Sequence, residues 1–183
     1  MGDFWVFGYG SLMWQPGFAH VETRQARLCG YRRMLCLRSQ VHRGTPERPG
    51  LVLGLEPGGS CLGMAFRVAG CLTDEVLSYL REREMSTKAY HEKQLSVRLD
   101  NGESVTALAY VVDRSHRQYA GAIDVDEIVR IISGAVGQSG RNEDYVLNTL
   151  KHLQALGIRD RQLESVAERL SLADLPEPAR QAL

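Results

Sequence analysis

The chain has 183 residues, and its 22 Lys and Arg side chains are balanced by 22 Asp and Glu side chains. This balance gives no net positive charge that would favour a nucleic acid or an anionic membrane, so neither partner is expected. Hydrophobic residues make up 44% of the chain, enough for the core of one globular domain of this length. We therefore expect a single domain over residues 1–175, followed by a polar tail over residues 176–183.

The start of the chain and the cysteines favour a cytoplasmic protein. No basic segment followed by a long apolar run stands near the N-terminus, so no secretory signal is predicted, and no stretch approaches the length of a transmembrane helix. Cys29, Cys36, Cys61 and Cys71 form no close Cys-x-x-Cys pair and are interpreted as reduced core residues. Because the five histidines are scattered as well, the sequence predicts no metal site.

The first hydrophobic run, Phe4–Phe7, is aromatic and β-branched, and it predicts a buried strand. It leads into Gly8-Tyr9-Gly10-Ser11, where the glycines leave backbone N–H groups accessible and Ser11 adds a hydroxyl. This stretch is a candidate cradle for a carboxylate or a phosphate, although an ordinary glycine turn has the same pattern. It lacks the Gly-Lys-Ser/Thr of a P-loop, and Met13 stands where a dinucleotide-binding motif has its third glycine.

Antiparallel strands are predicted for most of the first two thirds. Residues 27–38 are interpreted as one or two strands, and the four arginines between Arg24 and Arg33 as a solvated face. Two hairpins are expected after a loop over residues 38–50. One joins 51–55 to 61–68 through Pro57-Gly58-Gly59, and the other joins 93–99 to 104–112 through Asp100-Asn101-Gly102.

The last third is predicted to be helical. Asp124 and Glu127 have the spacing of a capping box at the start of one helix. Asn142 is the expected N-cap of a second helix that Gly157 ends, and residues 162–172 have the pattern of a third. Strands followed by helices indicate an α+β fold.

A further helix, between the two expected hairpins, carries the most informative residue. Thr73 is its expected N-cap, and Val76 and Leu80 mark its buried face. Glu84 follows Leu80 by four residues and therefore falls on the same buried face, whereas Glu82 falls nearly opposite and should be solvated. The sequence thus predicts a carboxyl group directed toward the interior.

Burial and a position in the last turn of the helix both raise the pKa of a glutamate. Glu84 is therefore a candidate general acid and base. A structural alternative is an ion pair between Glu84 and Arg81 or Arg83, and Tyr90 is a candidate to orient the carboxyl group.

Three motifs in this order resemble those of the ChaC-type, glutathione-specific γ-glutamylcyclotransferases, over roughly residues 4 to 160. Two shorter stretches, His42-Arg43-Gly44 and Tyr119-x-Gly121, also fit the family. The three motifs are Val6-Phe7-Gly8-Tyr9-Gly10-Ser11-Leu12, Tyr79-Leu80-x-x-Arg83-Glu84 and Gly137-x-Ser139-Gly140-Arg141-Asn142-x-x-Tyr145.

The resemblance implies a γ-glutamylcyclotransferase-like fold, a mixed β-barrel with surrounding helices. It also implies a lyase that cleaves glutathione to 5-oxoproline and cysteinylglycine without a cofactor. Glu84 matches the family's catalytic glutamate, and residues Val6 to Leu12 are assigned to substrate binding. Within them, the Tyr9-Gly10-Ser11-Leu12 loop would hold the γ-glutamyl moiety through backbone N–H groups and the Ser11 hydroxyl. Tyr145 matches a tyrosine near the substrate, and Arg43 is assigned to the glycine end.

Three alternatives remain open from the sequence. A cyclotransferase of the same fold would act on other γ-glutamyl amino acids or γ-glutamylamines, and the departures from the family pattern at Met85–Tyr90 and over residues 91–112 bear on that choice. A non-catalytic regulatory protein would keep the cradle for a small anion. A cysteine hydrolase would require Cys36 and His42 to form a thiolate–base pair. The sequence does not indicate an oligomeric state.

Overall fold

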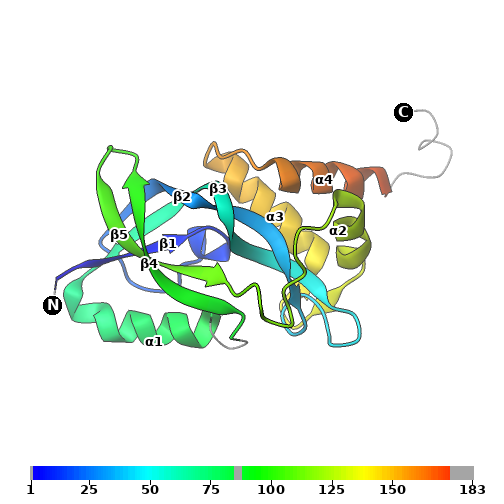
Figure 1. Cartoon of the computed structure of the whole chain (residues 1–183), viewed down its shortest axis with the longest axis horizontal. Coiled ribbons are helices and arrows are strands. Elements are labelled where there is room, and N and C mark those ends of the chain that lie inside the picture. The colour runs from blue at the N-terminus through cyan, green and yellow to red at the C-terminus, as the bar shows by residue number, and fades with distance from the viewer. Residues whose placement is uncertain (1, 85–87, 174–183) are drawn as a thin grey trace. The chain divides into compact units, whose positions relative to one another are not determined.

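The computed structural model describes residues 2–84 and 88–173 (Figure 1). Its chain divides into two compact units, of which unit 1 comprises Met1–Met34 and Leu53–Tyr119, and unit 2 comprises Leu35–Val52 and Ala120–Leu183. The expected polar tail over 176–183 and the residues 85–87 lie outside the described residues. The expectation of a single domain over 1–175 stays a prediction.

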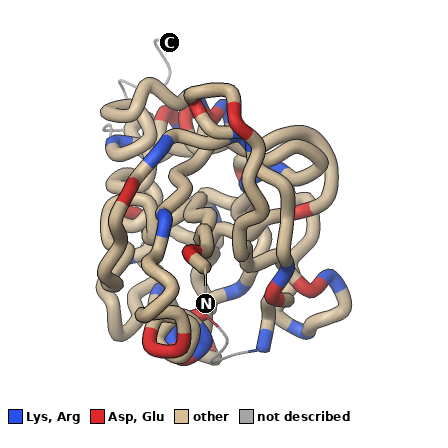
Figure 2. Tube along the Cα trace, turned by 90° about the vertical axis from the view of Figure 1, so that its left-hand side faces the viewer, with Lys and Arg blue, Asp and Glu red and all other residues tan. Residues whose placement is uncertain are grey.

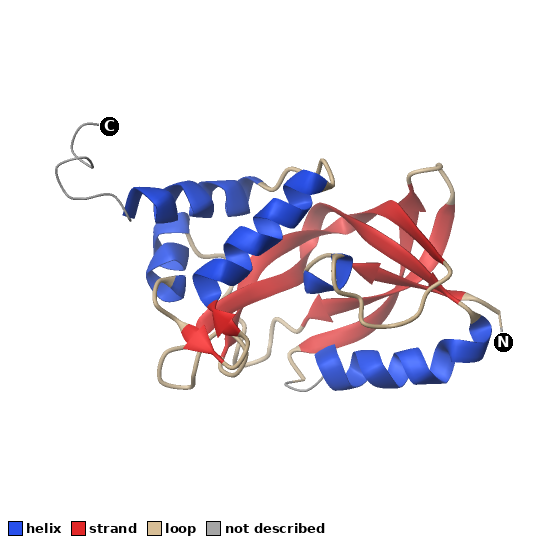
Figure 3. Ribbon diagram, turned by 180° about the vertical axis from the view of Figure 1, so that it is seen from behind, coloured by secondary structure: helices blue, strands red, loops and turns tan. Residues whose placement is uncertain are grey.

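Unit 1 is built on a closed barrel in which the strands follow the order β1-β3-β2-β4-β5. Strand β1 is antiparallel to β3 and parallel to β5, so the barrel is mixed, as the sequence predicted. Two strands, β2 and β3, begin or end in unit 2. The strands are β1 (Phe4–Gly8), β2 (Glu22–Ser39), β3 (Gly50–Val68), β4 (Tyr90–Leu99) and β5 (Ser104–Val112), drawn in red in Figure 3.

The predicted hairpin around Pro57-Gly58-Gly59 is wrong, because this segment lies inside the single strand β3. Gly58 and Gly59 have φ values of +108° and +73°, which side chains with a Cβ rarely adopt. Two such glycines bend a strand without reversing it, as a closed barrel requires. The second predicted hairpin is confirmed, since β4 and β5 pair antiparallel from Tyr90 and Val112 to Arg98 and Ser104.

Helix α1 (Thr73–Glu84) lies along the barrel of unit 1 (Figures 1 and 3). Its expected buried face is confirmed, since Val76 and Leu80 are buried. Thr73 is the first residue of the helix rather than its N-cap, and its hydroxyl donates to the Gly70 carbonyl in the short helix η2 (Gly70–Leu72). We call the buried set around α1 the α1 cluster, which comprises Val6, Leu12, Val68, Val76, Leu80, Leu108 and Tyr110.

Unit 2 contains α2 (Val125–Ile132), α3 (Asn142–Ala155) and α4 (Arg161–Ala173), with α4 packed against the other two helices. A short hairpin of β6 (Val136–Gly137) and β7 (Gly140–Arg141) precedes α3. The predicted helices over the last third are therefore confirmed for the described residues.

The helix caps of unit 2 agree with the sequence only in part. Asp124 is the N-cap of α2 and accepts from the Glu127 N–H at 2.8 Å, but the Glu127 carboxylate binds Arg130 instead of completing a capping box. Asn142 is not a cap. It is the first residue of α3, it is fully buried, and its amide pairs with both backbone groups of Leu51.

All four cysteines are free thiols. Cys36 and Cys61 are buried, but Cys29 and Cys71 are exposed, so the interpretation of all four as core residues is wrong. Cys29 follows the buried Leu28 on β2 and points to the opposite face of that strand.

Candidate active site

The expected cradle begins where β1 ends. After Gly8 the chain turns into the short helix η1 (Ser11–Met13), which the bond from the Met13 N–H to the Gly10 carbonyl closes at 2.9 Å. Val6, Phe7 and Leu12 have buried side chains, and the Tyr9 side chain is also mostly buried. Gly10 and Ser11 are partly exposed, so they are the part of the cradle that a ligand reaches first.

Arg33 on β2 fixes the start of the cradle. Its Nε donates to the Tyr9 carbonyl at 2.5 Å and its Nη2 donates to the Leu62 carbonyl at 2.6 Å. The interpretation of the Arg24–Arg33 run as a solvated face is therefore wrong for Arg33, which is partly buried and bound to the main chain. Arg27 on the same strand is exposed, as the sequence predicted.

Arg83 connects the other end of the cradle to α1. Its Nη2 donates to the Ser11 hydroxyl at 2.9 Å, and its Nη1 donates to the Gln15 carbonyl at 2.7 Å. Its Nη1 also donates to the Tyr79 hydroxyl, one turn earlier on α1, at 2.9 Å. That hydroxyl packs so closely on Gly17 that a Cβ at this position would collide with it. The Arg83 guanidinium thus joins α1, through Tyr79, to the cradle and the residues after it, through Ser11 and Gln15.

Glu84 is the last residue of α1, and 19% of its side chain is exposed. The ion pair that the sequence left open is formed with Arg83, whose Nε lies 3.2 Å from the Glu84 Oε1. Burial raises the pKa of the Glu84 carboxyl above its usual range, although the Arg83 guanidinium opposes that shift. Glu82 is exposed, as expected. Glu84 is therefore held beside Ser11 through one shared arginine.

Two other neighbours considered from the sequence have different partners. Arg81 forms its ion pair with Glu92 rather than with Glu84. Tyr90 donates its hydroxyl hydrogen to the Leu53 carbonyl at 2.9 Å, so this hydrogen does not serve to orient Glu84.

Arg43 and Tyr145 form a second group, in unit 2. The Arg43 guanidinium lies over the Tyr145 ring, 5.2 Å from its centroid. It also donates to the Ser139 carbonyl at 2.5 Å, in the turn between β6 and β7. The third sequence motif thus folds around Arg43, and its residues Ser139 and Tyr145 both contact the arginine.

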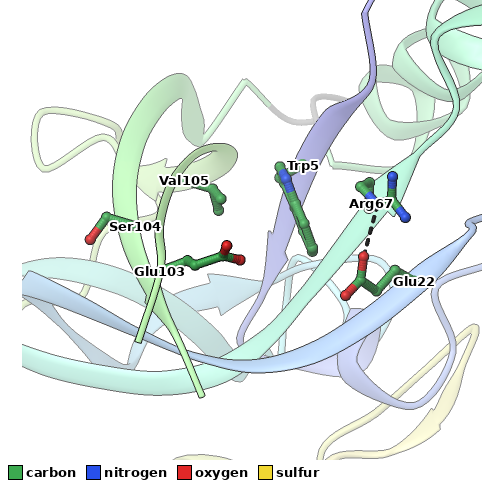
Figure 4. Close-up of a pocket in the computed structure, with 6 residues that line it drawn as sticks. All are labelled: Trp5, Glu22, Arg67, Glu103, Ser104 and Val105. Atoms are coloured by element: carbon green, nitrogen blue, oxygen red, sulfur yellow. Dashed lines mark hydrogen bonds and ion pairs between the residues drawn. The ribbon is translucent and has the colours of Figure 1, made fainter. Parts of the chain in front are cut away.

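A hollow of about 620 Å³ lies elsewhere in unit 1, and none of the sequence-predicted site residues is among the six described residues that line it. Figure 4 shows Trp5 between Val105 and Glu103 on one side and Arg67 and Glu22 on the other. Arg67 is paired with Glu22 at 2.9 Å, so the basic group of this hollow already has a partner.

The described residues contain no group of three or more His, Cys, Asp or Glu side chains arranged to hold a metal ion. Within the same residues, no helix combines the length and the apolar character needed to span a membrane. Lys and Arg positions are interspersed with Asp and Glu positions along the described chain (Figure 2).

The sequence model of the ChaC-like protein family matches residues 4–172. The chain belongs to this family. A glutathione-specific γ-glutamylcyclotransferase of Escherichia coli (strain K12) is 35% identical over 159 residues, which are 87% of this chain and 69% of the relative. One from Schizosaccharomyces pombe is 33% identical over 174 residues, covering 85% of each chain.

A solved structure gives the same fold. The crystal structure of a glutathione-specific γ-glutamylcyclotransferase from yeast superposes with a TM-score of 0.81 and 21% identity, covering 92% of this chain and 97% of the yeast chain. The expected γ-glutamylcyclotransferase-like barrel is thereby confirmed for this ChaC-like protein.

Proposed function

We propose that this ChaC-like protein is a γ-glutamylcyclotransferase that cleaves glutathione to 5-oxoproline and cysteinylglycine without a cofactor. The observation that carries the proposal is the arrangement of Glu84, Arg83 and Ser11, in which a carboxyl group of raised pKa is tied to the candidate cradle. The names of the relatives, both glutathione-specific enzymes, support the same substrate.

The reaction needs no protein nucleophile. The α-amino nitrogen of the substrate attacks its own γ-carbonyl carbon, the ring C–N bond forms, and the amide C–N bond to the cysteine residue breaks. The attacking amine loses a proton and the leaving amine gains one, so no water is consumed. One carboxyl group with a raised pKa serves both transfers, and we assign this role to Glu84.

The cradle has the task of holding the γ-glutamyl group in ring-closing geometry. We assign the α-carboxylate of the substrate to the backbone N–H groups of Tyr9, Gly10, Ser11 and Leu12 and to the Ser11 hydroxyl. Arg33 and Arg83 bind this segment at its two ends. These contacts support a cradle whose backbone has its binding conformation before the substrate arrives. Val6, Phe7 and Gly8 act as the buried base of the cradle, because their side chains or Cα atoms are packed in the core.

The substrate-binding roles of Arg43 and Tyr145 stay predictions, and both come from the family resemblance. The Arg43 guanidinium, stacked on an aromatic ring, fits a carboxylate ligand, which is the chemistry of the glycine end of glutathione. A cytoplasmic location is likewise proposed, since it is where a reduced tripeptide thiol would be available. Other γ-glutamyl amino acids or γ-glutamylamines are the alternative substrates, and a non-catalytic regulatory role is the alternative function.

The first experiment measures release of 5-oxoproline from glutathione by the purified protein and by the variant Glu84→Gln. We expect the variant to lose about 100-fold or more of the activity, the typical contribution of a general acid–base group. Glu82→Gln is the matched control, because this glutamate is exposed on the opposite face of the same helix.

Each other outcome contradicts a defined part of the proposal. Release from γ-glutamyl-alanine but not from glutathione would identify the alternative substrate class. If no γ-glutamyl compound yields 5-oxoproline, the proposed reaction is refuted and the non-catalytic regulatory role remains. Full activity of Glu84→Gln would refute the assignment of Glu84 while preserving the reaction.

A further inference from the structure

Tyr110 on β5 carries a buried hydroxyl group without a hydrogen bond. Only 1% of the residue is exposed, and its ring belongs to the α1 cluster together with Leu12 of the cradle and Leu80 of α1. Within the described part of the chain, its hydroxyl oxygen is the buried side-chain polar atom that lacks a partner. Leaving such a group unpaired costs stability, so a phenylalanine would suit the free protein better.

The groups that face this hydroxyl are charged. Glu92 lies directly opposite Tyr110 across the β4–β5 pair, and Arg81 of α1 binds Glu92. Burial, together with the carboxylates of Glu92 and Glu84, raises the pKa of Tyr110 well above its ordinary value, although Arg81 opposes the shift. Tyr110 is therefore protonated at neutral pH, and its hydroxyl is a hydrogen-bond donor without an acceptor among the described residues.

The two carboxylates differ in how fully they are used. Arg81 donates to both oxygens of Glu92, at 2.8 and 3.0 Å. Glu84 has a single contact, between its Oε1 and Arg83, and its other oxygen has no partner among the described residues. Of the two carboxylates whose charge acts on the Tyr110 hydroxyl, the one with an unused oxygen is therefore Glu84, which follows Leu80, a residue packed in the same cluster as the Tyr110 ring, by one helical turn.

We propose that Tyr110 is a positioning residue for Glu84, and that it donates its phenolic hydrogen to the free carboxylate oxygen while Glu84 handles the substrate's proton. This inference rests on the function proposed above, in which Glu84 is the acid and base. Arg83 then binds one oxygen of the carboxylate and Tyr110 the other, so that the carboxylate plane is fixed from two sides.

A donor of this kind favours the ionised form of Glu84 when the substrate is bound. Its removal therefore moves the acid limb of the pH profile of kcat to higher pH. The other charged groups near Glu84 and Tyr110 are Arg83, Glu92 and Arg81. They are the same in the wild type and in Tyr110→Phe, so they do not cause a difference between the two pH profiles. We expect Tyr110→Phe to lower kcat by about 10- to 100-fold, the range for a hydrogen bond to a charged group, with little change in KM.

The test compares Tyr110→Phe with Tyr90→Phe. Tyr90 packs against the same α1 cluster, but its hydroxyl is used in the bond to the Leu53 carbonyl. For each variant we would measure the thermal unfolding midpoint, and the pH dependence of kcat and KM with glutathione. We expect Tyr110→Phe to keep or raise the midpoint while lowering kcat and moving the acid limb, and Tyr90→Phe to lower the midpoint.

Three outcomes would overturn the inference. An unchanged kcat and pH profile in Tyr110→Phe, with an active wild type, refutes the role of Tyr110 and leaves the proposed function intact. A midpoint lowered as much as in Tyr90→Phe means that the hydroxyl is paired in the folded protein, and Glu92, opposite Tyr110 across the strand pair, would then be the candidate acceptor. A wild-type protein that releases no 5-oxoproline from any γ-glutamyl compound removes the proposed function and this inference with it.

Discussion

Two arginines fix the candidate cradle through contacts that only a forked side chain can make together. Arg33 donates to two main-chain carbonyls from separate nitrogens, and Arg83 reaches a hydroxyl group, carbonyl groups and a carboxylate. A lysine has the same charge but a single nitrogen, so it cannot hold several acceptors at fixed angles. The geometry of the guanidinium, more than its charge, is therefore the property that the cradle requires.

Arg33→Lys tests this requirement. We expect KM for glutathione to rise about 10-fold with a smaller loss in kcat, because the cradle loses one of its two supports while Glu84 and Arg83 stay in place. Steady-state kinetics measure both constants. Arg27→Lys, at an exposed position of the same strand, should leave both unchanged. Equal KM values in Arg33→Lys and Arg27→Lys would mean that Arg33 does not support the substrate-binding conformation.

At this scale the sequence identified Glu84 and offered Arg83 as an ion-pair partner, but it did not predict the contacts that tie Arg83 and Arg33 to the cradle. A period of 3.6 residues places Glu84 on the buried face of α1, and that requires only local information. The contact between Arg83 and Ser11 joins residues 72 positions apart, and the contact between Arg33 and Tyr9 joins residues 24 apart. No periodicity within one element predicts such contacts. The sequence does not predict the unpaired hydroxyl of Tyr110 either, because a strand pattern indicates which side chains are buried but not which hydrogen bonds they form.

At the scale of the elements, the start of α3 depends on a contact that replaces a helix cap. The Asn142 Oδ1 accepts from the Leu51 N–H at 2.6 Å, and its Nδ2 donates to the Leu51 carbonyl at 2.8 Å. The Asn142 amide therefore forms the two hydrogen bonds that the backbone N–H and carbonyl of Leu51 would otherwise form with a neighbouring strand. Asn142 was a reasonable cap candidate because capping and this pairing both require a short polar side chain.

Asn142→Asp distinguishes the two roles. An aspartate caps a helix as well as an asparagine does, but it cannot donate to the Leu51 carbonyl, and it places a charge in a fully buried position. We expect the free energy of unfolding to fall by about 2 kcal/mol or more, as measured by denaturant titration. Asp124→Asn, at the N-cap of α2, is the matched exchange and should change it by less than about 0.5 kcal/mol. Similar values for both variants would restore the capping role of Asn142.

The strands illustrate the same limit. The β4–β5 hairpin was predicted correctly because Asp100-Asn101-Gly102 turns the chain and the alternation on both sides fixes the pairing locally. The Pro57-Gly58-Gly59 segment has an equally strong turn signal, yet β3 continues through it. Its course is decided by strands that are distant in sequence, since β3 lies between β1 and β2 in the barrel. The sequence thus predicted the fold class, the helices and one hairpin, and the family resemblance supplied the barrel.

At the scale of the whole molecule, one buried and one partly buried glutamate of unit 1 give opposite dependences of stability on pH. Glu56 is 3% exposed and binds the Tyr119 hydroxyl and the Arg32 guanidinium. Although burial opposes the charged form, these bonds lower the pKa of Glu56 below its ordinary value of 4.5. Glu84 has the reverse balance, because burial outweighs Arg83 and the pKa lies above 4.5. Glu56 is thus stabilised as an anion, whereas the raised pKa of Glu84 favours its protonated form.

The sign of each shift predicts how the unfolding midpoint of two variants depends on pH. Glu56 contributes stability above about pH 4.5 that is lost as the pH falls through its lowered folded pKa, so Glu56→Gln should unfold at a lower temperature at pH 7 and approach the wild type in acid. Glu84 reduces stability as the pH rises from about 4.5 through its raised folded pKa. Glu84→Gln should therefore match the wild type at low pH and unfold at a higher temperature at pH 7.

Thermal unfolding of the wild type and both variants from pH 4 to pH 8 measures these differences. A midpoint of Glu84→Gln below that of the wild type at pH 7 would mean that the ion pair with Arg83 outweighs burial and that Glu84 is a structural residue. A higher midpoint combined with loss of 5-oxoproline release would instead separate function from stability at one residue. An amide at position 84 would then give the more stable protein. The carboxyl group is kept because the reaction needs a group that can both take up and release a proton.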